Sequence, residues 1–387
     1  MLIHSIPLRL FSLIVWLSGC AGPLSHPPTV AGRPPPSESD AVDSQKNQTS
    51  PPLQGHYQAT YLSGDYAGYP ALMAFIEQMV IRHGFARDYL LGLFSGVQRK
   101  QWTLDYMARD APSSGTARAL APKPGGWSRY RKQFLTDYHI NRGVQFWNRN
   151  AMALKKAGLR YGVPENIIMG ILGVETAYGA NLGKDRIIDA LTTLAVDYPR
   201  RAEYFTGELE SFLLMTRSEG MDPAQPRGSY AGAMGLGQFM PGSFLKWAQD
   251  LDGDGRRDLW NPADAIASVA HYFAVHGWKT GEPVVTPARV SGTGYKTLEY
   301  GYDKPYTLQQ LAAYGVEPAA PMPLRVASTG QAPAFRFLRL GVDTGEEHWL
   351  GHDNFYVITR YNHSTHYAMA VYQLAQAVER RYREQAH

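Results

Sequence analysis

Residues 167–172, Ile-Ile-Met-Gly-Ile-Leu, form an apolar run that must be buried, and an acidic side chain follows closely at Glu175. A carboxyl group beside such a run lies where water is scarce, and desolvation disfavours its charged form and raises its pKa. A carboxylic acid that stays protonated near neutral pH can donate a proton to a glycosidic oxygen. Glu175 is therefore a candidate catalytic acid. The alternative is a glutamate at the edge of a helix that reaches solvent or caps a turn.

A second segment, residues 229–241, is dense in Gly and Ala and also carries Ser229, Tyr230, Gln238 and Phe239. Small residues let a backbone approach a ligand or another backbone closely. Ser229 and Gln238 offer hydrogen bonds, whereas Tyr230 and Phe239 offer flat faces. A Gly-rich surface loop without a role would avoid such large apolar groups. We therefore interpret the segment as part of a binding site.

Hydrophobic periodicity predicts a mostly helical chain. Apolar residues repeat at helical spacing from Leu72 to Val80 before Gly84 ends the run, and Pro164 suits the first turn of the helix that carries Glu175. Further helices are expected at residues 85–98, 143–161, 203–218, 262–276 and 367–383. From about residue 282 Pro and Gly become frequent, and residues 335–340 and 355–358 are typical of strands. The pattern indicates a helical body with a small β-rich insertion.

The N-terminus has the layout of a signal peptide. Arg9 precedes an apolar stretch at residues 10–17 that is too short to span a bilayer as a helix. Leu-Ser-Gly-Cys at residues 17–20 resembles a bacterial lipoprotein cleavage box, in which Cys20 becomes the lipidated first residue after residues 1–19 are removed. Cys20 is the only cysteine, so an intrachain disulfide is excluded. Ala21 in place of aspartate favours the outer membrane under the sorting rules of such lipoproteins.

Residues 20–56 are expected to form a disordered tether. They are rich in Pro, Ser, Thr, Asn and Gln and poor in aliphatic residues, so they cannot bury enough apolar surface to offset the entropy of ordering. About 330 residues remain beyond the tether, enough for a large core and more than one domain. The net charge of +4 is too small to indicate nucleic-acid binding.

Residues 250–258, Asp-Leu-Asp-Gly-Asp-Gly-Arg-Arg-Asp, match the first nine positions of a calcium-binding loop. Carboxylates stand at Asp250, Asp252, Asp254 and Asp258, Gly255 occupies the sharp turn, and Arg256 offers a backbone carbonyl. The twelfth position carries Asn261 where the pattern has a bidentate glutamate, and Asp264 is the nearest carboxylate that could replace it. The expected ion would stabilise the fold without taking part in catalysis. The alternative is an acidic, solvated turn between helices.

Four ordered blocks resemble the membrane-bound lytic murein transglycosylase B family. They are residues 173–179 (Gly-Val-Glu-Thr-Ala-Tyr-Gly), residues 198–205 (Tyr-Pro-Arg-Arg-Ala-Glu-Tyr-Phe), residues 229–241, and residues 361–367 (Tyr-Asn-His-Ser-Thr-His-Tyr). Four blocks at consistent spacing are far more specific than a single motif. The resemblance runs from about Tyr57 to the last helix.

The resemblance implies a mainly α (α+β) fold with a lysozyme-like core. The expected parts are an N-terminal α domain at residues 57–155 joined by a C-terminal helix at 368–387, a catalytic core at 156–281 that includes the calcium loop at 250–264, a β-rich domain at 282–350, and a return to the core at 351–367. A monomer is expected. Cell-wall synthesis enzymes are possible partners beside the glycan strands and the membrane.

The resemblance also implies a reaction on the β-1,4 bond between N-acetylmuramic acid and N-acetylglucosamine in peptidoglycan. Glu175 would first protonate the leaving oxygen. It would then act as a base toward the muramoyl 6-hydroxyl, so that a 1,6-anhydro sugar forms without water. The motif blocks offer no obvious second carboxylate, and the N-acetyl group of the substrate would take that part. No cofactor is expected for catalysis.

Site roles follow from the same resemblance. Ser229 is expected to hydrogen-bond and orient the Glu175 carboxyl, and Gln238 and Asn362 to hold N-acetyl or hydroxyl groups of the glycan. Arg200 and Arg201 are expected to meet carboxylates of the peptide or lactyl group; the alternative is a solvated basic pair. Five tyrosines are expected to line the groove, although core packing is the common fate of an aromatic residue on a helix: Tyr130, Tyr230, Tyr272, Tyr361 and Tyr367.

Two other functions remain open at this level. A hydrolytic muramidase on the same fold would need a positioned water and usually a second carboxylate. A cell-wall-binding lipoprotein without catalysis would not need Glu175 together with Ser229.

Overall fold

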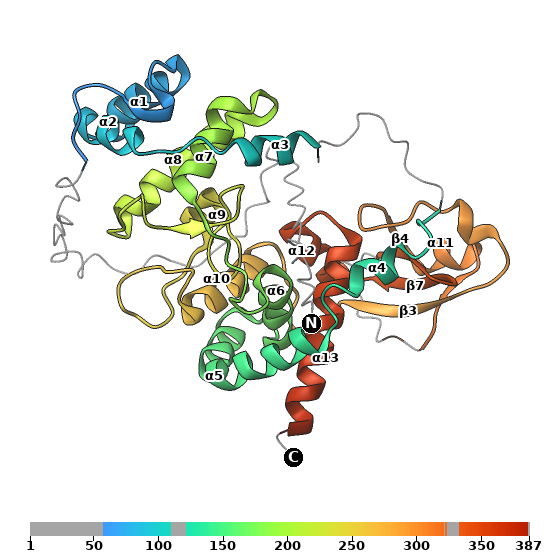
Figure 1. Cartoon of the computed structure of the whole chain (residues 1–387). Coiled ribbons are helices and arrows are strands. Elements are labelled where there is room, and N and C mark those ends of the chain that lie inside the picture. The colour runs from blue at the N-terminus through green and yellow to red at the C-terminus, as the bar shows by residue number, and fades with distance from the viewer. Residues whose placement is uncertain (1–56, 110–120, 321, 323–332, 386–387) are drawn as a thin grey trace, which may run out of the picture.

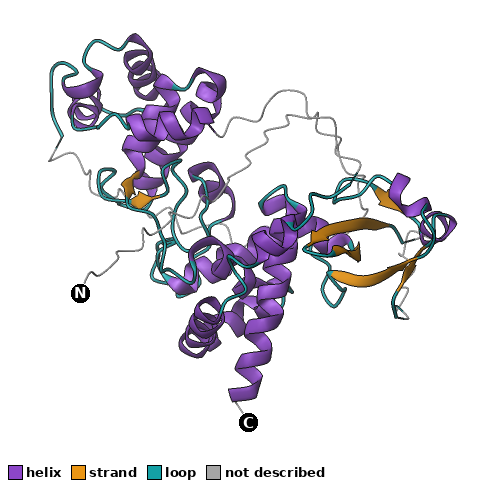
Figure 2. Cartoon of the chain, turned by 45° about the vertical axis from the view of Figure 1, so that its right-hand side comes forward, coloured by secondary structure: helices purple, strands orange, loops and turns teal. Residues whose placement is uncertain are grey.

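The computed structural model describes residues 57–109, 121–320, 322 and 333–385. Helices dominate these residues, and a five-stranded sheet lies to one side of them (Figures 1 and 2). The mainly α (α+β) class expected from the sequence is confirmed. The signal peptide, the tether and Cys20 lie outside the described residues. No helix in the described part of the chain is long and apolar enough to cross a membrane.

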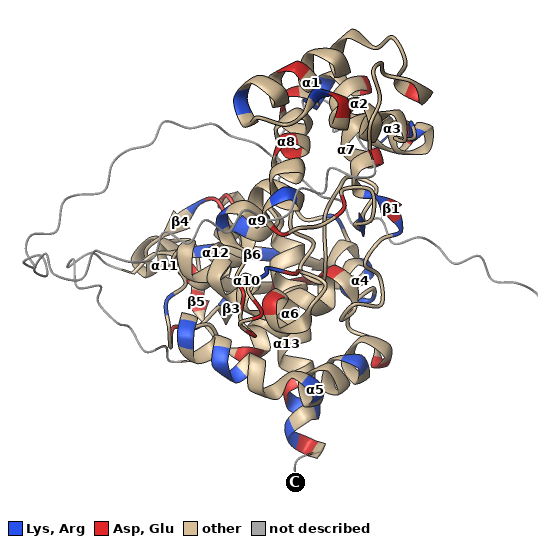
Figure 3. Cartoon of the chain, turned by 90° about the vertical axis from the view of Figure 1, so that its left-hand side faces the viewer, with Lys and Arg blue, Asp and Glu red and all other residues tan. Residues whose placement is uncertain are grey.

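The first three helices belong to an upper lobe of the molecule. They are α1 (Pro70–His83), α2 (Arg87–Ser95) and α3 (Gln101–Arg109). They lie against α7 (Ile187–Asp197) and α8 (Ala202–Ser218), as Figures 1 and 3 show from two sides. Helix α1 ends as the sequence predicts, because Gly84 adopts a left-handed conformation with φ 65° that glycine tolerates at no steric cost.

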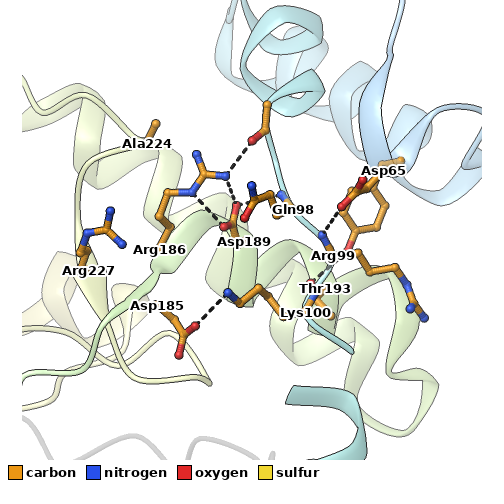
Figure 4. Close-up of polar contacts among 12 residues, drawn as sticks. Asp65, Gln98, Arg99, Lys100, Asp185, Arg186, Asp189, Thr193, Ala224 and Arg227 are labelled. Atoms are coloured by element: carbon orange, nitrogen blue, oxygen red, sulfur yellow. Dashed lines mark hydrogen bonds and ion pairs between the residues drawn. The ribbon is translucent and has the colours of Figure 1, made fainter. Parts of the chain in front are cut away.

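A buried carboxylate fixes the start of α3 to α7 (Figure 4). Arg186 donates two hydrogen bonds to the Asp189 carboxylate, from Nε at 2.9 Å and from Nη2 at 2.8 Å. The backbone N–H of Gln98 donates to the same carboxylate at 3.1 Å. The N–H of Lys100 donates to Thr193 Oγ1 at 3.0 Å, and its Nζ lies 3.0 Å from the Asp185 carboxylate. The residues that lead into α3 therefore have little freedom.

Four helices form the centre of the molecule: α5 (Asp137–Tyr161), α6 (Glu165–Thr176), α10 (Pro262–Val275) and α13 (Thr365–Gln385). Every residue of α6 from Ile167 onward is buried. Helix α13 approaches α6 closely because α6 carries glycine at the contact. A Cβ at Gly170 would collide with the Val371 carbonyl oxygen of α13. The apolar run at residues 167–172 is thus buried against the last helix of the chain.

The β-rich part contains β3 (Val285–Val290), β4 (Pro305–Tyr306), β5 (Val316–Pro318), β6 (Phe335–Val342) and β7 (Gly345–Gly351). They pair antiparallel in the order β4-β6-β7-β3-β5. Six buried side chains give this part a small core of its own, namely Leu298, Leu311, Val316, Phe335, Phe337 and Leu350. The strand predicted at residues 335–340 is confirmed as part of β6.

The other α-helices and strands of the described residues lie within or between these parts. They are α4 (Gly126–Arg131), α9 (Pro241–Trp247), α11 (Leu308–Ala313), α12 (Asp353–Tyr361), β1 (Asp185–Arg186) and β2 (Arg227–Gly228). Helix α4 packs between β6 and α13. Helices α7 and α8 pack with each other, and α7 also packs with α1 and α3 of the upper lobe, while α5 and α13 pack with α6. The expected domain boundaries remain a prediction, and these contacts join elements across them.

The strand predicted at residues 355–358 is wrong, because these residues lie in α12. Phe355, Val357 and Ile358 have high strand propensity, but propensity yields to tertiary packing. All three are buried, together with Asn354, and this spacing matches one face of a helix. Asp353 stabilises the helix start through ion pairs with Lys279 and Arg336, at 2.6 and 2.8 Å.

Candidate active site

Glu175 lies in the last turn of α6 and is only 8% exposed. Burial raises the pKa of its carboxyl group to about 8, because the charged form is poorly solvated there. A hydrogen bond from Tyr367 acts in the opposite direction on this pKa. The carboxyl group is therefore protonated at neutral pH and can donate a proton, as a catalytic acid must.

The chain leaves α6 through an unusual turn. Ala177 and Tyr178 are consecutive residues with φ 48° and 58°, a conformation that costs energy for any residue with a side chain. The Thr176 hydroxyl lies 3.0 Å from the Leu236 carbonyl oxygen and accepts the Gly179 N–H at 3.1 Å. Thr176 thereby attaches the turn to the Gly-rich loop at residues 229–241. Sequence reasoning did not assign a role to Thr176, although it stands inside the first block.

Three of the predicted tyrosines lie near Glu175, and one of them binds it. Tyr367, on α13, donates a hydrogen bond from its hydroxyl to Glu175 Oε1. Burial raises the pKa of Tyr130, Tyr361 and Tyr367, and the charge of Glu175 adds to the increase in each case. The hydroxyl of Tyr361 donates to the Gly237 carbonyl oxygen in the Gly-rich loop. These tyrosines stay protonated, so they offer donors and apolar faces around the acid.

Tyr272 packs against Tyr361. Its ring lies 4.9 Å from the Tyr361 ring, edge to face, and its hydroxyl donates to the Arg360 carbonyl oxygen at 2.6 Å. The side chain is buried. Its contacts are those of a packing residue that holds Tyr361 in place.

Ser229 forms its hydrogen bonds within the Gly-rich loop, and its predicted contact with Glu175 stays a prediction. Its Oγ accepts hydrogen bonds from the N–H groups of Ala231 and Ala233, at 3.3 and 3.0 Å. A serine at the start of a turn commonly binds its own backbone in this way. The side-chain hydrogen bond that Glu175 accepts in this structure comes from Tyr367.

Gln238 and Asn362 differ in whether their side-chain amides already have hydrogen-bond partners. Gln238 adopts φ 52°, and its Nε2 donates to the Gly235 carbonyl oxygen at 2.9 Å, which closes the Gly-rich loop on itself. Asn362 follows α12 directly, and its Oδ1 is buried without a hydrogen-bond partner among the described residues. A buried acceptor without a partner is rare and costly. Asn362 is thus prepared to accept a hydrogen bond from a ligand.

Tyr230 and the Arg pair make contacts elsewhere. The Tyr230 ring packs against Tyr106 and Trp102 of α3, at 4.8 and 5.7 Å between ring centroids. Arg201 lies over the Tyr204 ring at 4.3 Å, and burial lowers the pKa of its guanidinium. Arg200 stands beside it in a single 3-10 turn, Pro199–Arg201, and is exposed. Their predicted contact with substrate carboxylates stays a prediction.

Three carboxylates of the acidic loop lie close enough together to hold a cation. Ligand oxygens of Asp250, Asp252 and Asp254 lie within 4.8 Å of one another. The N–H groups of Gly253 and Gly255 donate to the Asp250 carboxylate at 2.6 and 3.0 Å, and both glycines have positive φ. An all-oxygen donor set of this charge fits calcium better than a transition metal.

Asp264 binds the backbone of the acidic loop, and its role as a calcium ligand stays a prediction. It is 1% exposed, and its two oxygens accept the N–H groups of Leu251 and Asp258 at 2.8 and 2.9 Å. It therefore closes the loop by binding both ends of it. Asn261 donates from Nδ2 to Asp252 at 2.6 Å and caps α10 with its Oδ1. Asp258 accepts the Trp260 N–H at 2.8 Å. The ligand roles of Asp258 and of the Arg256 carbonyl stay predictions.

The chain is similar to known proteins in both sequence and structure. Residues 68–376 match the Transglycosylase SLT domain family. The chain is 45% identical, over 95% of its length and 96% of the relative, to membrane-bound lytic murein transglycosylase B of Escherichia coli (strain K12). The solved E. coli lytic transglycosylase SLT35, in complexes with bulgecin A and with calcium, shares 47% identity and a TM-score of 0.75, covering 86% of this chain and 99% of that one.

A more distant solved structure carries a cell-wall fragment. SltB3 from Pseudomonas aeruginosa in complex with NAG-NAM-pentapeptide is 28% identical, with a TM-score of 0.67, over 80% of this chain and 79% of that chain. The family match spans most of the chain, and the E. coli relative covers nearly all of it. The chain therefore belongs to the Transglycosylase SLT domain family.

Proposed function

We propose that the protein is a lytic transglycosylase that cleaves the β-1,4 bond between N-acetylmuramic acid and N-acetylglucosamine in peptidoglycan and leaves a 1,6-anhydromuramoyl end. The observation that carries this proposal is the buried carboxyl group of Glu175, with its pKa raised to about 8 and a hydrogen bond from Tyr367. The relatives named as lytic murein transglycosylases support the substrate and the reaction class.

Glu175 would act first as an acid and then as a base. Its neutral carboxyl group would give a proton to the glycosidic oxygen as the bond to C1 of the muramoyl sugar breaks. The resulting carboxylate would take the proton of the muramoyl 6-hydroxyl, and that oxygen would bond to C1. Tyr367 would keep the carboxyl in one orientation through both steps, because its hydroxyl can donate to either state.

The surroundings of Glu175 favour this route over hydrolysis. The pKa of Glu175 is shifted by burial and by the Tyr367 hydrogen bond, and no second carboxylate of the described residues contributes to that shift. Glycosidases that use water normally hold a second carboxylate within about 5–10 Å of the first. The oxocarbenium-like state would be stabilised by the N-acetyl group of the substrate, and the buried Oδ1 of Asn362 would accept the N–H of such a group.

The chemical nature of the released ends tests the proposal. Purified peptidoglycan treated with the protein and analysed by mass spectrometry is expected to yield anhydromuramoyl ends. Reducing muramoyl ends would make the protein a hydrolytic muramidase instead. Binding to the cell wall without release would make it a cell-wall-binding lipoprotein.

Calcium binding is proposed at the acidic loop, with Asp250, Asp252 and Asp254 as ligands and a stabilising role. The support is the fit of the three carboxylates and the calcium complex of the E. coli lytic transglycosylase. Calcium at a hundredfold excess over its Kd should stabilise the fold by about 2.7 kcal/mol, seen as a rise in Tm. Asp252→Asn should remove most of that rise, whereas Asp343→Asn, at an exposed carboxylate of the β-rich part, should keep it. An equal rise in the absence of both Asp252 and Asp254 carboxylates would contradict the site.

Membrane attachment is proposed through a lipid on Cys20, with the enzyme facing the periplasm from the outer membrane. The E. coli relative is described as membrane-bound, and Cys20 follows a signal-peptide layout. Fractionation of cells that carry Cys20→Ser tests the anchor, and undiminished recovery in the membrane fraction would contradict it.

A further inference from the structure

Three aromatic side chains form a platform, Trp102 and Tyr106 on α3 and Tyr230 in the Gly-rich loop. Trp102 stacks on Tyr106 with ring centroids 5.3 Å apart and an interplanar angle of 23°. Tyr230 meets both rings edge to face, at 5.7 and 4.8 Å. Trp102 is 49% exposed, so a large part of its indole ring faces solvent while the other two rings support it.

The platform is rigid on the side of α3. Figure 4 shows how the residues just before α3 are held, with Gln98, Arg99 and Lys100 bound to Asp189, Asp65 and Thr193. Trp102 follows Lys100 by two residues. A ring whose backbone is fixed loses little conformational entropy when a ligand packs on it. Single exposed apolar residues are common on protein surfaces. Trp102 differs from them because its backbone is held and two other rings pack against it.

The platform is connected to the catalytic acid through one loop. Tyr230 stands near the start of the Gly-rich loop, whose other end contacts the surroundings of Glu175: Leu236 binds the Thr176 hydroxyl, and Gly237 binds the Tyr361 hydroxyl. Figures 1 and 3 show α3 above α9, and α6 below α9. A polymer that follows this loop away from Glu175 would arrive at Trp102.

We propose that the aromatic platform is a distal sugar-binding subsite that holds the glycan strand several sugars away from the cleaved bond. The inference rests on the proposed function, since it assumes a glycan substrate. The C–H face of a pyranose ring is apolar and flat, and a broad exposed aromatic face supported from below is complementary to it. The subsite adds affinity for long strands and does not contact the reacting atoms.

Kinetics on substrates of two lengths test the subsite. For Trp102→Ala we expect kcat/KM on long glycan strands to fall about five- to tenfold, mostly through KM, which is the size of one aromatic stacking contact. A tetrasaccharide that spans only the cleaved bond should be turned over as by the unmodified protein. Trp102→Phe should recover most of the loss. Tyr314→Ala, which removes a 44% exposed aromatic side chain from the β-rich part, serves as the matched control and should change neither value.

Each outcome decides between explanations. Unchanged kinetics on long strands would overturn the subsite, and an equal loss on both substrates would show that Trp102 acts by shaping the Gly-rich loop. In either case the unmodified protein would still release anhydromuramoyl ends. Absence of such ends with the unmodified protein would instead refute the proposed function. Co-sedimentation of the Glu175→Gln protein with long strands, with and without Trp102→Ala, gives a readout of binding that does not depend on turnover.

Discussion

Glu175→Gln is expected to reduce the release of anhydromuramoyl ends from peptidoglycan by about 10²- to 10⁴-fold, the usual contribution of a positioned general acid or base. The amide has nearly the shape of the carboxyl group and can still accept the hydrogen bond from Tyr367, but it cannot give or take a proton. Mass spectrometry of the released fragments measures the loss. We expect the effect on kcat to exceed the effect on KM, because the proton moves only in the transition state.

The fold of this variant should not suffer. The pKa of Glu175 is raised from 4.5 to about 8 in the folded protein, so its contribution to stability is fully present below pH 4.5 and is lost as the pH rises through about 8. Glutamine does not ionise, and the Glu175→Gln protein should have an equal or higher Tm at pH 9. Glu165→Gln, in the first turn of the same helix, is the control and should keep full activity. Undiminished activity of Glu175→Gln would remove the acid from the mechanism.

Tyr367→Phe is expected to lower kcat about 10- to 100-fold, since a hydrogen bond to a charged group contributes about 1.5–3 kcal/mol. It should also move the pH profile. The acid must be protonated, so kcat/KM of the unmodified enzyme should fall as the pH rises through about 8. The hydrogen bond from Tyr367 lowers the pKa of Glu175. Its removal should therefore shift the alkaline limb to higher pH.

A pH–rate profile on soluble glycan strands measures both effects. Tyr372→Phe, on the same helix α13, is the matched control, because Tyr372 is not among the groups that act on the pKa of Glu175. A fall in kcat without a shift of the limb would indicate that Tyr367 acts on the substrate and leaves the pKa of Glu175 unchanged. A shift to lower pH would contradict a hydrogen bond that stabilises the charged carboxylate.

The sequence determined the parts of the protein that depend on neighbouring residues. The helix that ends at Gly84, the buried helix that carries Glu175 and the strand at residues 335–340 all follow from periodicity and local turn chemistry. The spacing of acidic residues and glycines at 250–255 likewise brought three carboxylates together. The mainly α class and the family also followed from the sequence. In each case the information lies within a few turns of chain.

Other features were decided only by the tertiary structure. The partner of Glu175 is Tyr367, 192 residues away, because glycines in α6 allow α13 to come close. Ser229 binds its own loop, and Asp264 binds two backbone N–H groups, and neither set of hydrogen bonds was predicted from the sequence. Residues 355–358 have the composition of a strand but form a helix, because a helix buries their apolar side chains on one face against the core. A short polar side chain has several local and distant hydrogen-bond partners within reach. The sequence shows which residues can donate or accept, but the packing of distant segments decides which partner each one binds.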